Sequence, residues 1–205
     1  SHAAVLARAL GIPAVVGLAA LPIGRLDGRE AVVDGDQARV YLQPSPAVMA
    51  AYQLRASEAE ALAARLGALR DEPAETPDGV RVPLQVNAGF IAELAPALAH
   101  GAEGIGLFRT EFAFMARETF PVEDEQYLLY RTVLESFAPK SVTLRTLDVG
   151  GDKSLPYFPM VEDNPFLGCR GIRFTLDHPE IFLIQLRARV RANAGLNNLR
   201  VLFPM

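Results

Sequence analysis

The sequence predicts an α/β protein built around a parallel sheet. From about residue 80 onward, short apolar strand-like runs alternate with longer helix-like segments. Helices that cross over between successive strands are typical of a parallel sheet. The 205 residues are 50% hydrophobic and 21% charged, which is the balance of a folded chain and excludes a disordered one.

The first 46 residues predict a small mixed unit. An apolar run over residues 13–17, bounded by turn residues, predicts a strand. Residues 31–33 and 39–42 are also apolar, and the turn sequence Asp-Gly-Asp at 34–36 between them predicts a β-hairpin. Two prolines in the sequence Pro-Ser-Pro at 44–46 then end the unit.

Residues 47–70 predict one long helix, because they are rich in Ala, Leu, Glu and Arg and contain no proline. Pro73 ends it, so the helix forms a connecting arm. Strands are expected at 82–88, 104–108, 141–147 and 199–203, with helices at 91–100, 124–137 and 179–194. In the last helix an apolar stripe is expected at Phe182, Leu186 and Val190. Four such strands form half of a (β/α)8 barrel or a small doubly wound sheet.

The composition restricts the partners. Twenty Lys and Arg residues against 24 Asp and Glu residues leave a net charge of -4, which does not favour nucleic acid or an anionic membrane as a partner. The single cysteine, Cys169, cannot form an internal disulfide, and no apolar run reaches the roughly 18 residues of a membrane span. We therefore expect a cytoplasmic protein.

His2 is the first candidate catalytic residue. It follows Ser1, a good N-cap, at the start of a helix-like stretch. Free backbone N–H groups at a helix start favour a bound anion, and neutral imidazole is a competent nucleophile near pH 7. A partly exposed terminal histidine is the alternative interpretation.

Arg109 and Arg145 are the candidate binding residues, since each lies near the carboxyl end of a predicted strand. Ligands bind at that edge of parallel sheets, and the guanidinium fork fits phosphate and carboxylate oxygens. The alternative is that each arginine pairs internally with an acid such as Glu111 or Asp148.

Two glycine-containing loops carry further cations. Lys153 ends the sequence Gly-Gly-Asp-Lys, where backbone N–H groups can approach an anion closely, but a simple turn is an equally open interpretation. Arg170 and Arg173 lie in a second such loop, beside Cys169. We find no His/Cys cluster with zinc spacing.

Five segments together resemble the phosphoenolpyruvate-utilising phosphotransferases. The similarity is greatest to the enzyme I family of the bacterial phosphotransferase system, in its sugar or nitrogen branch. The segments cover essentially the whole chain in the family's order: SHAAVLAR at 1–8, GLFRTEF at 106–112, LRTLDVGGDK at 144–153, NPFLGCRGIR at 164–173 and LFPM at 202–205.

The resemblance implies a fold and a set of roles. Residues 1–46 would be the C-terminal part of a phosphohistidine swivelling domain, 47–75 a helical linker, and 76–205 the N-terminal half of a phosphoenolpyruvate-binding TIM barrel. His2 would accept the phosphoryl group, and Arg109 and Arg145 would bind phosphoenolpyruvate. Lys153, Arg170 and Arg173 would give electrostatic support nearby.

The resemblance also implies partners beyond the substrate. These are a histidine-containing phosphocarrier protein, Mg²⁺ held by carboxylates beyond residue 205, and a second copy in a homodimer of the full-length protein. The chain would then be a fragment that cannot phosphorylate itself. A pyruvate phosphate dikinase or phosphoenolpyruvate synthase-like enzyme, and a non-catalytic regulatory module of the same fold, are the alternative functions.

Overall fold

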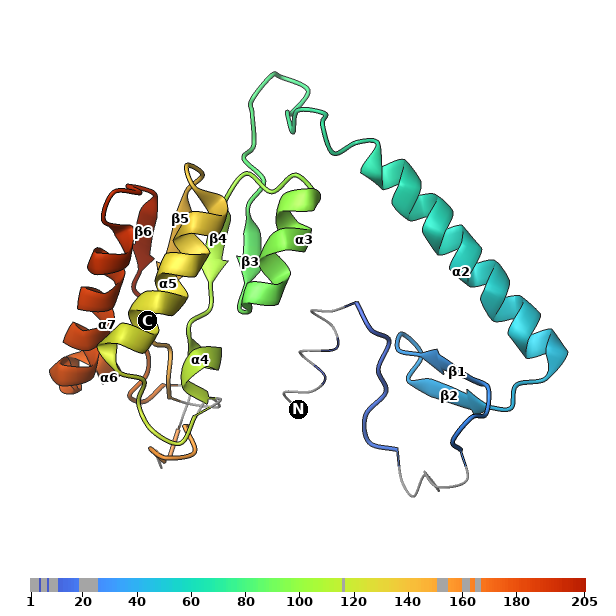
Figure 1. Ribbon diagram of the computed structural model, residues 1–205, viewed down its shortest axis with the longest axis horizontal. Coiled ribbons are helices and arrows are strands. Elements are labelled where there is room, and N and C mark those ends of the chain that lie inside the picture. Colours follow the sequence, from blue (N-terminus) through green and yellow to red (C-terminus); the bar gives the residue numbers. More distant parts are fainter. Residues whose placement is uncertain are drawn as a thin grey trace. The chain divides into compact units, whose positions relative to one another are not determined.

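The computed structural model describes residues 4, 7, 11–18, 26–115, 117–150, 155–159, 163–164 and 167–205. His2 and Lys153 lie outside these residues. The chain separates into two compact units, Ser1–Glu72 and Pro73–Met205. Figure 1 shows the elements of both units, which we describe one at a time.

A two-stranded antiparallel sheet forms the described centre of the first unit. Strand β1 (Ala31–Asp34) pairs with β2 (Arg39–Leu42), as the sequence predicted. The prediction of a strand over residues 13–17 is wrong, because residues 12–18 form no strand. Pro13 lacks an N–H group for a strand ladder, and Val16 is 66% exposed, so the run lies beside the hairpin without pairing with it; a Cβ at Gly35 would lie 3.4 Å from the backbone of Ala14.

Helix α2 (Pro46–Gly67) follows the hairpin and confirms the long helix expected over 47–70. The Ser45 hydroxyl accepts a hydrogen bond from the N–H of Val48 at 3.4 Å, and Pro46 occupies the first turn, where its missing N–H is tolerated. No side chain of α2 is buried. Its position therefore depends on specific polar contacts near its start.

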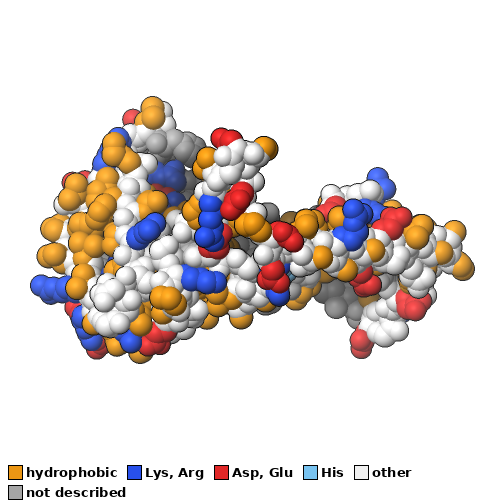
Figure 2. Space-filling view, turned by 90° about the horizontal axis from the view of Figure 1, so that it is seen from above, with side chains coloured by type: hydrophobic (Ala, Val, Ile, Leu, Met, Phe, Trp, Pro, Cys, Tyr) orange, Lys and Arg blue, Asp and Glu red, His pale blue; other side chains and the backbone are white. Residues whose placement is uncertain are grey.

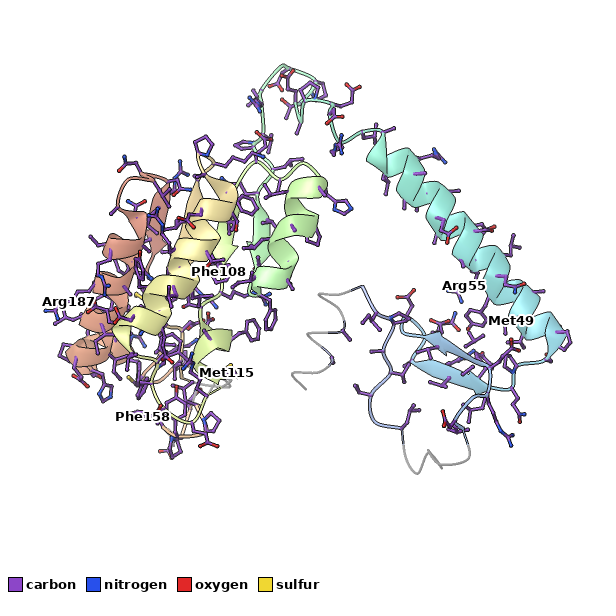
Figure 3. All side chains as sticks on the ribbon, viewed as in Figure 1. Met49, Arg55, Phe108, Met115, Phe158 and Arg187 are labelled. Atoms are coloured by element: carbon purple, nitrogen blue, oxygen red, sulfur yellow. The ribbon has the colours of Figure 1, made fainter. Side chains whose placement is uncertain are left out.

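The carboxylate of Asp34 makes those contacts. It accepts hydrogen bonds from the Tyr52 hydroxyl at 2.7 Å and from Arg55 Nη1 at 3.0 Å, both on α2, and Arg55 is labelled in Figure 3. The N–H of Gln37 and the Tyr52 hydroxyl lower the pKa of Asp34 to about 2. The same bond to Asp34 raises the pKa of Tyr52 to about 12. The first half of α2 is thus tied to the hairpin.

The second unit contains a four-stranded parallel sheet. Its strands lie side by side in chain order, so the topology never reverses. Reversal is the mark of a doubly wound sheet, whereas unbroken chain order is that of a barrel wall. The strands are β3 (Val86–Ala88), β4 (Ile105–Phe108), β5 (Val142–Arg145) and β6 (Leu199–Leu202).

Helices connect these strands. The three predicted helices are present, the first as a short 3-10 turn, η2, continued by α3. The sequence analysis missed two short helices, α4 and α6. The bounds are η2 (Ile91–Glu93), α3 (Leu94–Ala99), α4 (Glu111–Met115), α5 (Glu123–Phe137), α6 (Ile172–Asp177) and α7 (Pro179–Asn193).

Residues of β3, β4 and β5 share one apolar core with α3, α5 and α7. Helix α7 faces it differently from the prediction, since Val190 of the expected apolar stripe is 70% exposed. The buried residues of α7 are Gln185, Ala188, Arg189 and Ala192. The small alanines allow α7 to pack closely. Its buried polar side chains, Gln185 and Arg189, form hydrogen bonds with other segments. The polar residues of α7 therefore did not indicate which face of the helix is exposed.

Figure 2 shows Lys or Arg and Asp or Glu side chains interspersed on one face of the molecule, in keeping with the small net charge of -4. Within the described ranges, no helix has both the length and the apolar character that crossing a membrane requires.

The Asp34 contacts predict an acid-sensitive first unit. Because the folded state lowers the pKa of Asp34 from 3.8 to about 2, its contribution to stability is complete above about pH 4 and is lost as the pH falls towards 2. Asp34→Asn should lower the melting temperature of this unit at pH 7 and flatten its dependence on pH below 4. Amide NMR signals of residues 31–42, followed against temperature, measure both effects.

Glu58→Gln is the matched control, because Glu58 is an exposed acid on α2, the helix that Asp34 contacts. It should leave the pH profile unchanged. An Asp34→Asn profile that coincides with that of the unsubstituted chain would contradict the prediction.

Candidate active site

Three strand ends meet at one edge of the parallel sheet. Arg109 directly follows β4, and Arg145 is the last residue of β5. The Arg109 N–H donates to the Ala88 carbonyl at 2.8 Å, and Gly89 continues the neighbouring strand beyond that point. The carboxyl ends of parallel strands therefore bring the two predicted arginines to the same edge.

Arg145 lies within a row of alternating charges. Its guanidinium forms an ion pair with Glu111 and a second with Asp148, with Nη1 3.3 Å from Oδ2. Arg170 contacts the same Asp148 through two hydrogen bonds, of 3.1 and 3.2 Å. The side chains of Glu111, Asp148 and Arg145 are only 5%, 4% and 14% exposed. Buried charges of this kind persist only when they are paired, so each member holds its neighbours in place.

Arg109 is different, since it forms no ion pair with any described residue. Its guanidinium lies 5.1 Å from the centre of the Phe112 ring, and Phe112 stacks on Phe90 at 4.6 Å. A side chain at Gly89 would lie 2.7 Å from the Phe112 ring, so glycine is required there. The Nε atom of Arg109 is buried and has no hydrogen-bond partner among the residues that the structure describes. Stacking thus fixes this cation without neutralising it.

Two glycines bring Arg170 to the row. A Cβ at Gly150, whose φ is 120°, would lie 2.4 Å from the Cys169 carbonyl oxygen. A Cβ at Gly171 would lie 2.6 Å from the Pro204 carbonyl oxygen. The Gly171 N–H also donates to Val149 at 3.1 Å. Close backbone packing between these segments therefore places Arg170 beside Asp148.

The remaining predicted residues lie elsewhere. His2 and Lys153 fall outside the described residues. Arg173 donates to the carbonyl groups of Leu167 and Gly168, at 3.3 and 3.2 Å, and thus supports its own loop. Cys169 packs at the margin of a second apolar core, with Sγ 3.5 Å from an Asp177 carboxylate oxygen.

The described carboxylates do not fit a magnesium site. Glu111 and Asp148 at the strand edge are both engaged by arginines, and Glu93 accepts hydrogen bonds from the N–H groups of Gly89 and Phe90. No group of three His, Cys, Asp or Glu side chains within the described ranges could hold a metal ion.

The arrangement is suited to a small anion that carries phosphate and carboxylate oxygens. Arg109, Arg145 and Arg170 bring three guanidinium groups to this strand edge. Guanidinium groups bind such oxygens through paired N–H donors. The sequence indicated Arg109 and Arg145 by their position, but it missed the Phe112 stack and the Arg170 fork. For Arg145, the alternative of internal pairing with Glu111 and Asp148 is confirmed, and the i, i+3 spacing of Arg145 and Asp148 indicated the second of these ion pairs.

Comparisons with known proteins agree with this geometry. The model of the PEP-binding domain of PEP-utilising enzymes, where PEP is phosphoenolpyruvate, matches residues 63–205. The model of the mobile domain of the same enzymes matches residues 1–38.

Curated relatives match the chain over its whole length. A protein of Escherichia coli K12 called phosphoenolpyruvate-dependent phosphotransferase system is 47% identical over 205 residues. Proteins called phosphoenolpyruvate-protein phosphotransferase in Bacillus sp. (strain S) and Haloferax volcanii are each 46% identical, over 206 and 209 residues. The chain covers 27%, 36% and 35% of these three relatives, so it spans about a third of their length.

The PEP-binding domain model covers more than half of the chain, and the arginine-lined strand edge lies within the matched residues. The chain therefore belongs to the PEP-utilising enzymes.

Proposed function

We propose that this chain is part of a phosphoenolpyruvate–protein phosphotransferase, the first enzyme of a phosphorelay for sugar uptake or nitrogen regulation. One observation carries the proposal. Arg109, a cation without an acidic partner among the described residues, lies at the same strand edge as the charge row of Glu111, Arg145, Asp148 and Arg170. The names of the relatives support the same activity and do not favour a dikinase or PEP synthase.

In the proposed reaction, the imidazole of His2 attacks the phosphorus of PEP. A P–N bond forms, the P–O bond breaks with its electrons going to the departing enolate oxygen, and the enolate takes up a proton at its methylene carbon to become pyruvate. Phosphoryl transfer needs mainly alignment and neutralisation of charge, which Arg109 and Arg145 would supply to the phosphate and carboxylate of PEP. Arg170 would hold Asp148, and through it Arg145, in position.

We further propose the roles of the two units. Residues 1–46 would belong to a swivelling domain that carries His2, 47–75 to a helical linker, and 76–205 to half of a PEP-binding barrel. The tie between Asp34 and α2 supports movement of α2 together with the hairpin, so the turning point would follow Gly67. His2 would then reach PEP and later a histidine-containing phosphocarrier protein.

The remaining elements of the proposal rest on the family alone. They are Mg²⁺ bound by carboxylates outside this segment, a homodimer of the full-length protein, and a cytoplasmic location.

His2 is tested by intact mass. The full-length protein that contains this chain, incubated with Mg²⁺ and PEP, should gain one acid-labile phosphoryl group, because phosphohistidine hydrolyses in acid. His2→Ala should gain none. A folded full-length protein that remains unmodified, or a His2→Ala variant that is still labelled, would overturn the assignment.

The two arginines should respond differently to substitution. Arg109→Met should raise the half-saturating PEP concentration at least about tenfold, the effect of losing a charged hydrogen bond, with little change in melting temperature, since Arg109 has no ion pair with a described residue. Arg145→Met should impair PEP use and also cost about 3 kcal/mol of stability, because the buried carboxylate of Glu111 loses the arginine that pairs with it, whereas Asp148 keeps its two hydrogen bonds to Arg170.

Steady-state kinetics and thermal unfolding measure these two effects. Arg81→Met is the control, since it removes an ion pair from an exposed arginine and should alter neither quantity much. Equal loss of stability in the Arg109 and Arg145 variants would contradict the contrast.

Domain movement is tested by distances between spin labels. In a Cys169→Ser background, labels at Leu62 on α2 and Ala99 on α3 should give a distance distribution that shifts when PEP is added. Labels at Asp36 and Leu62, both in the first unit, should keep one narrow distance. A pair on separate units that is narrow and insensitive to PEP would refute a swivelling linker.

A further inference from the structure

Arg189 is a fully buried cation that the site described above does not use. It lies in α7, its relative exposure is 0%, and it is the largest side chain in the described core. The neighbouring Arg187, labelled in Figure 3, is exposed on the same helix. Burial of an arginine is costly unless the protein compensates its charge, so Arg189 requires an explanation.

The contacts of Arg189 lead to the strand end that carries Arg145. Its Nη2 donates to the Arg145 carbonyl oxygen at 2.6 Å, and the Thr110 hydroxyl donates to the same oxygen at 2.9 Å. The guanidinium lies 5.2 Å from the centre of the Tyr130 ring. Side chains of α7 and of the turn after β4 therefore fix the backbone carbonyl of Arg145 through hydrogen bonds.

A chain of buried amide and hydroxyl groups supports the same segment. Gln185, one turn before Arg189 on α7, accepts a hydrogen bond from the Leu147 N–H at 2.9 Å. Its amide donates to the Tyr130 hydroxyl at 3.1 Å, which in turn donates to Gln126 at 2.9 Å. The two residues of α7 thus bond to the backbone on both sides of Thr146, at the last residue of β5 and just beyond it.

The charge of Arg189 also acts on the row at the strand edge. Burial lowers the pKa of Arg189, while its interactions with Tyr130 and with the charge of Glu111 oppose that shift. Two nitrogens of the guanidinium, Nε and Nη1, have no hydrogen-bond partner in the described part of the chain. Glu111 thus forms an ion pair with Arg145 and also interacts electrostatically with Arg189.

We propose that Arg189 is a positioning residue for the PEP site. It holds the Arg145 carbonyl through a hydrogen bond from Nη2, so that the end of β5 and the guanidinium of Arg145 stay in place for the substrate anion. This inference rests on the proposed function and adds a residue that never contacts the substrate.

Three variants of the full-length protein test it. Arg189→Gln keeps an amide donor but loses the charge, Arg189→Lys keeps the charge, and Arg187→Gln removes an exposed charge two residues away. We expect Arg189→Gln to raise the half-saturating PEP concentration about tenfold, as for one charge-assisted contact. Arg189→Lys should stay within about threefold of the unsubstituted protein, and Arg187→Gln should match it.

A second half-reaction separates positioning from general damage. Transfer from the phosphorylated protein to the carrier does not use PEP, so its rate should be the same in Arg189→Gln and the unsubstituted protein. An unchanged half-saturating concentration in Arg189→Gln would overturn the proposal. Equal impairment of the Gln and Lys variants, or equal loss in both half-reactions, would also overturn it.

A measurement on the unsubstituted protein covers the case in which Arg189→Gln does not fold. The ¹⁵N signals of the Arg189 guanidinium should shift when PEP saturates the site, whereas those of Arg187 should not. An Arg189 signal that ignores PEP, while Arg145 responds, would refute the positioning role. If PEP neither labels His2 nor shifts Arg145, the proposed function itself fails.

Discussion

Compensation of buried charge governs the second unit. Burying the charge of Arg145, Glu111 or Asp148 singly would be costly. The three charges are buried together and pair with one another at the edge of the sheet. Removing any one of them would leave its partners in an unfavourable setting. The ion pairs that make burial of these charges possible therefore also keep the geometry of the edge rigid. A rigid, positively biased edge needs little reorganisation when a small anion binds.

The topology makes this compensation possible. Parallel strands in unbroken order bring Arg109 and Arg145 to one edge, and the short helix α4 begins two residues after Arg109. Glycine at 150 and 171 allows backbones to approach more closely than a side chain would permit. On the core side, Gln185 and Arg189 of α7 form hydrogen bonds with the backbone at the end of β5. The first unit obeys a smaller version of the rule, with Asp34 as its one buried acid among the described residues.

Much of this could be predicted from the sequence, because local signals agree with the fold. The hairpin, α2 and the four parallel strands follow from apolar periodicity and turn residues, and Arg109 and Arg145 follow from their place after strands. Local signals failed where tertiary contacts decide. The 13–17 run has strand composition but pairs with no strand among the described residues. Helix α7 buries Gln185 and Arg189, which bond to groups far away in the sequence. The Arg170 fork depends on backbone packing that no spacing reveals.

The partners at the strand edge come from far apart along the chain. Arg145 pairs with Glu111 across 34 residues, Arg170 reaches Asp148 across 22, and Arg189 reaches Arg145 across 44. Each of these contacts requires segments far apart in the sequence to come together, so a chain that is unfolded in this region lacks the assembled cation cluster. Under the proposed function, affinity for PEP would then depend on the completed fold. A ligand that binds only there also shifts the equilibrium towards the finished molecule, so PEP would act as a folding ligand as well as a reactant.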